Sequence, residues 1–178
     1  MKKFPVAALA ALALAAAQAV AQSPAVTTVP GMPPVVDPTN LYSEAAAGKY
    51  APATANALSR IYVPNVRSDD VYVIDPATMK VVDRFKVGVN PQHVVPSWDL
   101  KTLWVANNAE HRTDGSLTPI DPATGKPGKP VAVDDPYNMY FTPDGRSAIV
   151  VAESRERLDF RDAHSMQLQQ SLSTPQCD

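Results

Sequence analysis

The stretch VYVIDPATMKVVDRFKVG, from Val71 to Gly88, decides the fold because part of it returns further along the chain. The stretch LTPIDPATGKPGKPVAV, from Leu117 to Val133, contains the same Ile-Asp-Pro-Ala-Thr-x-Lys phrase. The two phrases begin at Ile74 and Ile120, which are 46 residues apart. Self-similarity at a period of roughly 20–50 residues is typical of solenoids, propellers and other repeat arrays. We therefore interpret the chain as a repeat protein.

Other segments recur at a similar spacing. Pro91-Gln92-His93 corresponds to Pro136-Tyr137-Asn138, and Trp98-Asp99-Leu100-Lys101 corresponds to Pro143-Asp144-Gly145-Arg146. Each unit thus contains an inner run that begins with proline, a run that ends in Ala-Asn or an equivalent, a run that ends in Ile-Asp, and an outer run. A period of about 41–46 residues with four strands per unit is typical of a β-propeller blade.

The chain from Arg60 onward has the texture of an all-β protein. Short β-rich runs alternate with turn signals about every 8–12 residues, which is the spacing of a sandwich or a propeller. The expected strands cover residues 60–65, 70–75, 80–87, 92–98, 102–107, 116–121, 129–133, 137–143, 147–153, 157–162 and 166–174. The turns between them carry Asp, Pro and Gly, which favour tight turns.

Two runs give the chain a family resemblance. Tyr62-Val63-Pro64-Asn65 and Trp104-Val105-Ala106-Asn107 resemble the YVTN-type β-propeller repeat, named for a Tyr-Val-Thr-Asn run, with the threonine replaced. The IDPATGK turn and the TPDGR turn add to the resemblance, whereas Val150-Val151-Ala152-Glu153 departs from it. The resemblance covers roughly residues 60–174 and implies a propeller fold. Proteins with this repeat include surface-layer proteins, periplasmic binding modules and the haem-d1-binding part of some nitrite reductases, so it implies no single activity.

We predict an all-β fold, a β-propeller in the form of an incomplete arc of about three four-stranded blades, at about 60–87, 91–133 and 137–174. The first unit has room for three strands only. Closed propellers hold roughly 4–8 blades, and repeat arrays need capping where the stack stops. We favour a fragment of a longer propeller as the explanation of this short count. Closure by self-association and a small independent β-sheet domain are the alternatives.

The N-terminus predicts export. Lys2 and Lys3 precede an Ala/Leu-rich run without charge, and Ala19-Val20-Ala21 supplies a small-x-small cleavage pattern. We expect a signal peptide over residues 1–21, cleaved between Ala21 and Gln22, and a periplasmic or secreted protein. The apolar run is shorter than the roughly 20 residues that a membrane-spanning helix needs. An uncleaved anchor is the less favoured alternative, and we expect no stable membrane span after cleavage.

The remaining composition sets further bounds. Residues 22–58 are rich in Pro and Ala and should form an extended segment of low order, followed by the partial propeller over 59–178. Without the leader the chain has 14 basic and 18 acidic residues, so a nucleic-acid partner has no electrostatic support. Cys177 is the only cysteine. In an exported protein it is either a free thiol, which we favour, or a bridge to a partner absent from this chain.

The inner runs supply the candidate binding site. In a propeller the first residues of each inner strand lie near one mouth of the central channel, so Gln92, His93, Tyr137 and Asn138 should form a ring of polar groups there. Such a ring could bind a small ligand or a protein, neither of which the sequence identifies. His93 is the sharpest candidate because imidazole can bind a metal or haem or transfer a proton near neutral pH. The alternative is that His93 is a hydrogen-bonding packing residue of the repeat.

No catalytic or metal-binding residue is predicted. His111 lies in a polar loop and His164 in a turn, no two histidines have ligand spacing, and the chain has no Cys-x-x-Cys-His motif. Asp69-Asp70 and Asp134-Asp135 should serve turns and sheet edges. The sequence therefore favours a non-catalytic binding module over an enzyme and requires no cofactor. The main alternative is a redox or haem-handling periplasmic propeller whose site needs blades absent from this chain, and a cell-surface or adhesion module is a third hypothesis.

Two structural expectations complete the prediction. Trp98 and Trp104 should pack between successive blades. Lys129-Pro130 should lie on an exposed sheet edge, where lysine and proline discourage pairing with other chains.

Overall fold

The computed structural model describes residue 30 and residues 32–175. The signal peptide predicted for residues 1–21, its cleavage site between Ala21 and Gln22, and Cys177 lie outside the described residues. Within the described part of the chain there is no α-helix, and no helix is long and apolar enough to cross a membrane.

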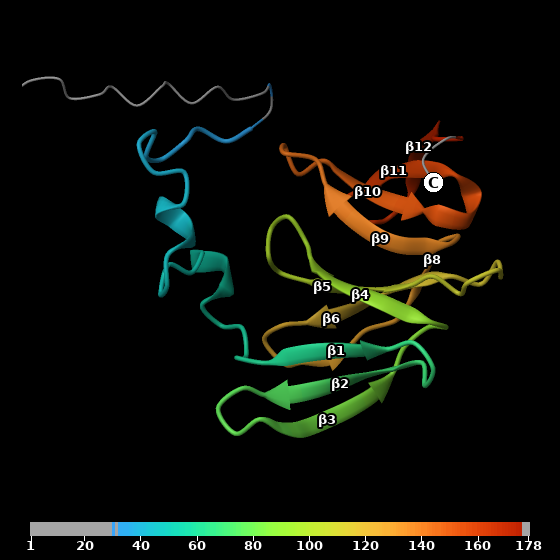
Figure 1. The fold of residues 1–178 in the computed structure, drawn as a ribbon, viewed down its shortest axis with the longest axis horizontal. Helices are drawn as coiled ribbons and strands as arrows, with labels where there is room; N and C mark the ends of the chain where they lie inside the picture. Colours follow the sequence, from blue (N-terminus) through green and yellow to red (C-terminus); the bar gives the residue numbers. More distant parts are fainter. Residues whose placement is uncertain (1–29, 31, 176–178) are drawn as a thin grey trace, which may run out of the picture.

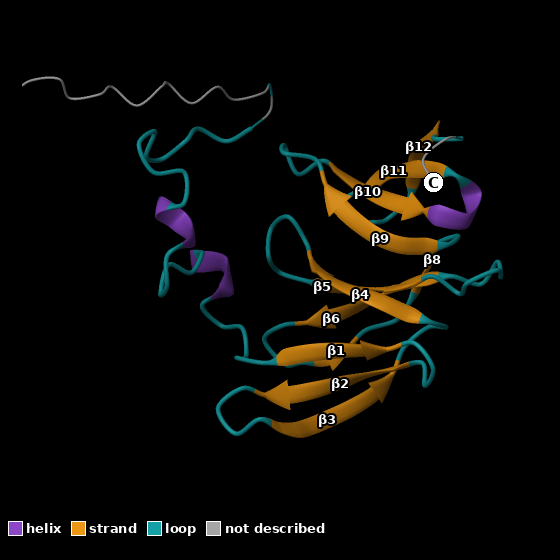
Figure 2. Cartoon of the chain, viewed as in Figure 1, coloured by secondary structure: helices purple, strands orange, loops and turns teal. Residues whose placement is uncertain are grey.

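The described residues form three antiparallel sheets, as Figures 1 and 2 show. Sheet 1 contains β1 (Ile61–Asn65), β2 (Asp70–Asp75) and β3 (Lys80–Lys86). Sheet 2 contains β4 (Pro91–Pro96), β5 (Leu103–Asn107), β6 (Ser116–Asp121), β7 (Lys126–Pro127) and β8 (Val131–Ala132). Sheet 3 contains β9 (Pro136–Phe141), β10 (Ser147–Ala152), β11 (Arg157–Asp162) and β12 (Leu168–Ser173). The all-β prediction is confirmed.

The three sheets follow one another in space in the order of the chain (Figure 1). Neighbouring strands within a sheet are also consecutive in sequence, apart from β8, which pairs with β6 beside β7. Ile74 lies in β2 of sheet 1, whereas Ile120 lies in β6 of sheet 2. The repeated phrase thus marks consecutive sheets, as expected of propeller blades.

The outer strand of sheet 2 differs from the prediction. A single strand was expected over 129–133, but two short strands, β7 and β8, both pair with β6. Proline has no backbone N–H to donate to a ladder, and Pro127 and Pro130 flank the interruption. Lys129 and Pro130 are exposed between the two short strands, as expected for a sheet edge.

Apolar side chains fill the two spaces between the sheets. Val71 of sheet 1 packs with Val105 and Ile120 of sheet 2. A second cluster joins Trp104 and Leu117 of sheet 2 to sheet 3. Because burial of apolar surface is the main favourable term in folding, these two interfaces hold the sheets together.

Trp98 adds a contact between sheets 2 and 3 at their turns. Its indole Nε1 donates a hydrogen bond to the Pro143 carbonyl at 3.2 Å. Gly145 lies against the indole, since a Cβ added there would come within 2.5 Å of the ring. Gly145 also has φ +70°, a conformation that other residues adopt only with strain. The expectation that Trp98 and Trp104 pack between blades is confirmed.

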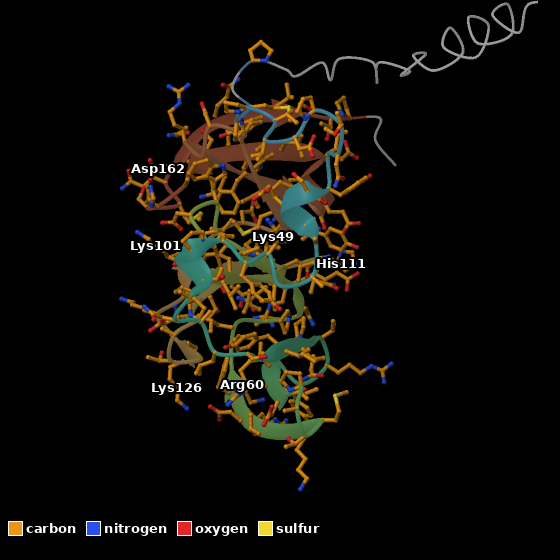
Figure 3. All side chains as sticks on the ribbon, turned by 90° about the vertical axis from the view of Figure 1, so that its left-hand side faces the viewer. Lys49, Arg60, Lys101, His111, Lys126 and Asp162 are labelled. Atoms are coloured by element: carbon orange, nitrogen blue, oxygen red, sulfur yellow. The ribbon has the colours of Figure 1, made fainter. Side chains whose placement is uncertain are left out.

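The N-terminal segment reaches sheet 2 at one of its turns. This segment holds two single turns of 3₁₀-helix, η2 (Ser43–Ala45) and η3 (Pro52–Thr54). The backbone N–H of Leu58 donates to the Pro122 carbonyl at 2.8 Å. Figure 1 shows the segment beside the sheets, and Figure 3 shows it, with Lys49, in front of them when that side is viewed directly.

Candidate functional site

The four predicted site residues lie at matching positions on two inner strands. Gln92 and His93 are the second and third residues of β4, and Tyr137 and Asn138 are the second and third residues of β9. All four side chains are half-buried. β4 and β9 contact each other, and of the four side chains His93 and Tyr137 meet directly. Asn138 Nδ2 instead donates to the Tyr140 hydroxyl at 3.2 Å, on the face of sheet 3 that is turned away from sheet 2.

A β-bulge occurs at the same position of both inner strands. In sheet 2, Pro91 pairs with Asn107 and His93 with Ala106, which leaves Gln92 without a partner in the register. In sheet 3, Pro136 pairs with Ala152 and Asn138 with Val151, which leaves Tyr137 as the extra residue. Bulges bend a strand and redirect its side chains, and they often lie beside functional sites.

His93 and Tyr137 meet across the interface between sheets 2 and 3. Their ring centroids are 5.2 Å apart with an interplanar angle of 79°, an edge-to-face arrangement. The Nε2 atom of His93 is buried without a hydrogen-bond partner. A buried imidazole nitrogen normally finds a partner, so His93 keeps an unused hydrogen-bonding group at this position.

The residue before each inner strand has a left-handed backbone. Asn90 has φ 49° and Asp135 has φ 50°, a region in which Asn and Asp are favoured among non-glycine residues. The Asn90 backbone N–H donates to Asp69 Oδ1 at 2.9 Å, which connects sheet 2 to the loop of sheet 1. The Asp135 carboxylate accepts the backbone N–H of Ser154 at 2.6 Å. Side-chain carboxylates therefore fix the backbone where both inner strands begin.

Two buried asparagines border the same region. The Asn107 Nδ2 group donates to Thr118 Oγ1 at 3.0 Å and to the Ser116 carbonyl at 3.0 Å. Its Oδ1 atom, like Oδ1 of Asn108, is buried without a partner. Gly88 lies against Asn107, because an added Cβ would come within 2.7 Å of the Asn107 Cβ.

We call this region the rim; it comprises Gln92, His93, Asn107, Asn108, Asp135, Tyr137 and Asn138.

Burial alters the titration of Asp135. Its side chain is only 1% exposed, and burial raises the pKa of this carboxyl, while the Ser154 N–H and the charge of Arg155 oppose that rise. The charged form of a buried carboxyl is disfavoured because it loses its water. Asp135 was expected to serve a turn or a sheet edge. Its carboxylate does bind the backbone of a loop at Ser154. Unlike a surface turn residue, however, Asp135 is buried and forms part of the rim.

A network of ion pairs supports sheet 3 next to the rim. Asp159 is fully buried and accepts hydrogen bonds from Arg157 Nε at 2.8 Å, Arg161 Nη2 at 3.3 Å and Ser171 Oγ at 2.6 Å. Burial alone would raise the pKa of Asp159, but the hydrogen bonds from Arg157 and Ser171 and the nearby positive charges outweigh it and lower the pKa. Asp134 extends the network by accepting from Arg155 at 3.0 Å.

The other two histidines lie apart from the rim's inner strands. The side chain of His111 is 84% exposed and lies 3.6 Å from Glu110. His164 is exposed in the turn after β11, where its N–H donates to Asp162 Oδ1 at 3.1 Å. Figure 3 shows His111 on one side of the molecule and Asp162 on the other. The predictions of a surface loop for His111 and a turn for His164 are confirmed.

The described residues hold no group of three His, Cys, Asp or Glu side chains placed to bind a metal ion. A cavity of about 330 Å³ lies elsewhere, between the N-terminal segment and sheets 1 and 2. It is lined by Leu58, Tyr62 and Leu103 among others and includes none of the four predicted site residues.

Sequence reasoning did not assign Asn107, Asn108 or Asp135 to the binding site. The sequence feature that could have identified Asn107 is its place at the end of the Tyr-Val-Thr-Asn-like run. The strand formed by this run lies beside the inner strand. For Asp135 the signal was its position directly before Pro136 in the repeat. The sequence offers no comparable signal for Asn108.

The three sheets follow each other in chain order, and each adds its strands consecutively. A polar rim lies at the starts of the inner strands. These features together define the class of β-propellers. The chain belongs to the YNCE-like β-propeller family, whose model matches residues 16–174. No curated protein matches the chain significantly.

Solved structures agree on the fold. Hydrazine synthase from Kuenenia stuttgartiensis is 25% identical, with a TM-score of 0.55, over 67% of this chain and 34% of its own length. The dihydro-heme d1 dehydrogenase NirN is 21% identical, with a TM-score of 0.52, over 65% of this chain and 24% of its own. A putative 6-phosphogluconolactonase from Bacteroides uniformis is 15% identical, with a TM-score of 0.51, over 67% of this chain and 39% of its own. The chain thus spans 24% to 39% of the length of these structures.

Proposed function

We propose that this protein is an exported, non-catalytic β-propeller module that binds a small ligand or a protein segment at the rim. The observation that carries the proposal is the contact of His93 with Tyr137 across two sheets, with His93 Nε2 left unpartnered. Ligand sites in repeat folds commonly lie where loops and strand ends from several units converge, and the rim is such a place.

The unpartnered atoms of the rim indicate the chemistry of the ligand. Oδ1 of Asn107 and Oδ1 of Asn108 are acceptors, and the His93 imidazole can accept or donate at Nε2, depending on its tautomer. These atoms are buried, so a ligand rich in hydroxyl or amino donors would satisfy them once the strand ends move apart to admit it. Each hydrogen bond to a group that is otherwise buried and unpaired removes a desolvation penalty of about 1–3 kcal/mol. We therefore favour a polyhydroxylated small molecule.

Thermal unfolding in the presence of gluconate and its lactone tests the proposal, because a ligand that binds only the folded state raises the melting temperature. We expect a rise for the wild type and a reduced rise for His93→Ala and Asn108→Ala, which remove two of these unpartnered atoms. His164→Ala, a histidine removed from an exposed turn, should respond like the wild type. An equal rise in all four proteins would place binding elsewhere, and no rise in the wild type would count against this ligand class.

A haem-handling role is the second candidate. It is favoured by the unused Nε2 of His93, since imidazole nitrogen is a common axial ligand of haem iron. The likeness in fold to a dihydro-heme d1 dehydrogenase is in keeping with it. Titration with free haem should then give a visible absorbance band that is lost in His93→Ala and kept in His111→Ala. A band of equal height in both variants would contradict a role for His93.

Export is the third part of the proposal and rests on residues 1–22 of the sequence. When the full chain is expressed in a Gram-negative host, we expect a mature protein in the periplasmic fraction whose first residue is Gln22. N-terminal sequencing and fractionation measure this. A full-length product that retains Met1 in the cytoplasm would contradict it.

A further inference from the structure

The cavity beside the N-terminal segment, about 330 Å³ in volume, is separate from the rim. Val94 and Pro96 in the second half of β4 line it, whereas His93 of the rim does not. Leu58 of the N-terminal segment and Leu103 at the start of β5 also line it. Figure 3 views the molecule from the side on which this segment lies. The volume is within the roughly 300–1,000 Å³ that is usual for small-molecule sites, so the cavity can hold a small ligand.

Most of the cavity wall is apolar. Tyr62, Val94 and Leu103 line it and also pack against the core between sheets 1 and 2. Leu100 and Pro122 add apolar surface from two turns of sheet 2. Because the burial of apolar surface favours binding, this wall suits a ligand with an apolar body.

Leu100 places its side chain in this wall from a strained backbone. Its φ is 60°, in the left-handed region that residues other than glycine rarely adopt. The corresponding residue in sheet 3 is Gly145, which has φ 70° and adopts it without strain. Backbone strain of this kind is concentrated at functional sites. The chain thus keeps a leucine at the cavity, where its own repeat shows that glycine fits.

Arg60 is the one charged residue among the described residues that line the cavity. Its side chain is 28% exposed, and its Nη1 atom donates to the Ser59 carbonyl at 2.7 Å. Asp75 is only a distant partner, since its Oδ1 lies 3.9 Å from Nη1 and accepts the Ala77 N–H at 2.9 Å. In the described part of the chain, no hydrogen bond uses Nε or Nη2 of Arg60. The guanidinium thus retains donors for a ligand.

These two donors suit a carboxylate. A guanidinium and a carboxylate can form two parallel hydrogen bonds, and such charge-assisted bonds are roughly twice as strong as neutral ones. Asp121, next to Pro122 of the wall, is bound within its own turn, because its carboxylate accepts the Ala123 N–H and the Thr124 hydroxyl, each at 2.9 Å. An anionic group on an apolar body therefore matches both the charge and the wall of the cavity.

We propose that the cavity binds a small carboxylic acid, with its carboxylate on Arg60 and its apolar body against Leu100 and Leu103. The pairing with Arg60 orients the ligand, and burial of the apolar body against the wall supplies affinity. The cavity shares no lining residue with the rim, so this proposal and the one made for the rim can fail independently.

NMR titration with phenylacetate at neutral pH tests the proposal, and phenylacetamide is its uncharged counterpart. We expect the acid to shift the methyl resonances of Leu100 and Leu103 with a Kd below about 1 mM, and the amide to bind at least about tenfold more weakly. Arg60→Gln should weaken binding of the acid by about tenfold or more, the scale of a hydrogen bond to a charged group. Arg67→Gln removes the same charge from an exposed turn and should bind like the wild type.

Leu100→Gly tests the apolar part of the site. Glycine adopts the left-handed backbone freely, so the variant should fold, and it should bind phenylacetate about threefold or more weakly because apolar contact is lost. His93→Ala at the rim should bind the acid like the wild type. Circular dichroism establishes that each variant is folded.

Three results would each overturn the proposal. The first is no binding of phenylacetate by the wild type up to about 10 mM. The second is equal affinity for the acid and the amide. The third is equal affinity of Arg60→Gln and Arg67→Gln for the acid, which would show that the Arg60 guanidinium does not hold the carboxylate.

Discussion

Asp159→Ala is expected to lower the free energy of unfolding by about 3–5 kcal/mol, the range for removing one partner from a buried ion pair. Asp159 is fully buried, and its carboxylate is the side-chain partner of Arg161, which is only 7% exposed. Without it the Arg161 guanidinium would stay buried with a single hydrogen bond, from Nη1 to the Met166 carbonyl. Urea unfolding followed by circular dichroism measures the change.

The effect of Asp159→Ala should depend on pH in a defined direction. The pKa of Asp159 is lowered in the folded protein from 3.8 in the unfolded chain. Its stabilisation is therefore present above pH 3.8 and is lost as the pH falls through the lower folded value. The difference between the wild type and the variant should shrink in that acid range. Asp144→Ala is the control, because Asp144 is an exposed turn residue paired with Arg146 and should cost about 1 kcal/mol or less. Equal losses for both variants would contradict the role given to burial.

Met139→Ala is expected to cost about 2–5 kcal/mol, the usual range for truncating a buried methionine to alanine. Met139 lies on β9 in the core between sheets 2 and 3 and is 0% exposed. Its truncation leaves a cavity in the interface that places Tyr137 against His93. We therefore expect lower stability in urea, together with a change in the imidazole proton resonances of His93 that reports its contact with the Tyr137 ring.

Met79→Ala is the matched control. Met79 is 73% exposed in the turn after β2, so the same chemical change should alter stability by less than about 0.5 kcal/mol. The His93 resonances should stay at their wild-type positions in this variant. If Met139→Ala unfolds in urea at the same concentration as Met79→Ala, the core does not depend on β9 as described.

Much of the fold could be predicted because local signals and the repeat agree. The two Ile-Asp-Pro-Ala-Thr phrases were expected to begin equivalent turns, and the carboxylates of Asp75 and Asp121 do accept the N–H of Ala77 and of Ala123, each at 2.9 Å. These bonds depend on residues two positions apart, so the sequence alone determines them. The order of strands follows from the same logic, because consecutive strands joined by short turns pair with each other.

The rim could be predicted only in part. The repeat placed Gln92 with Tyr137 and His93 with Asn138, and the structure brings His93 and Tyr137 into contact. The bulges and the left-handed backbone of Asn90 and Asp135 were not predicted. They depend on how the start of each inner strand fits against neighbouring loops, which no local pattern encodes. The division of the outer strand of sheet 2 likewise depends on competition between β7 and β8 for one partner strand.

The paired bulges let two requirements of a β-strand be met separately: a fixed pairing with the neighbouring strand, and freedom to vary the side chains at one end. Gln92 and Tyr137 have no facing partner in the register. Val94 and Val95 in one strand, and Met139 and Tyr140 in the other, pair in the register that resumes after the bulge. A substitution at the bulge therefore removes no facing pair. Evolution can therefore exchange side chains at the proposed binding rim, blade by blade, without a change of register. A scaffold with this property is suited to diversification, and relatives of one shape can come to recognise unlike molecules.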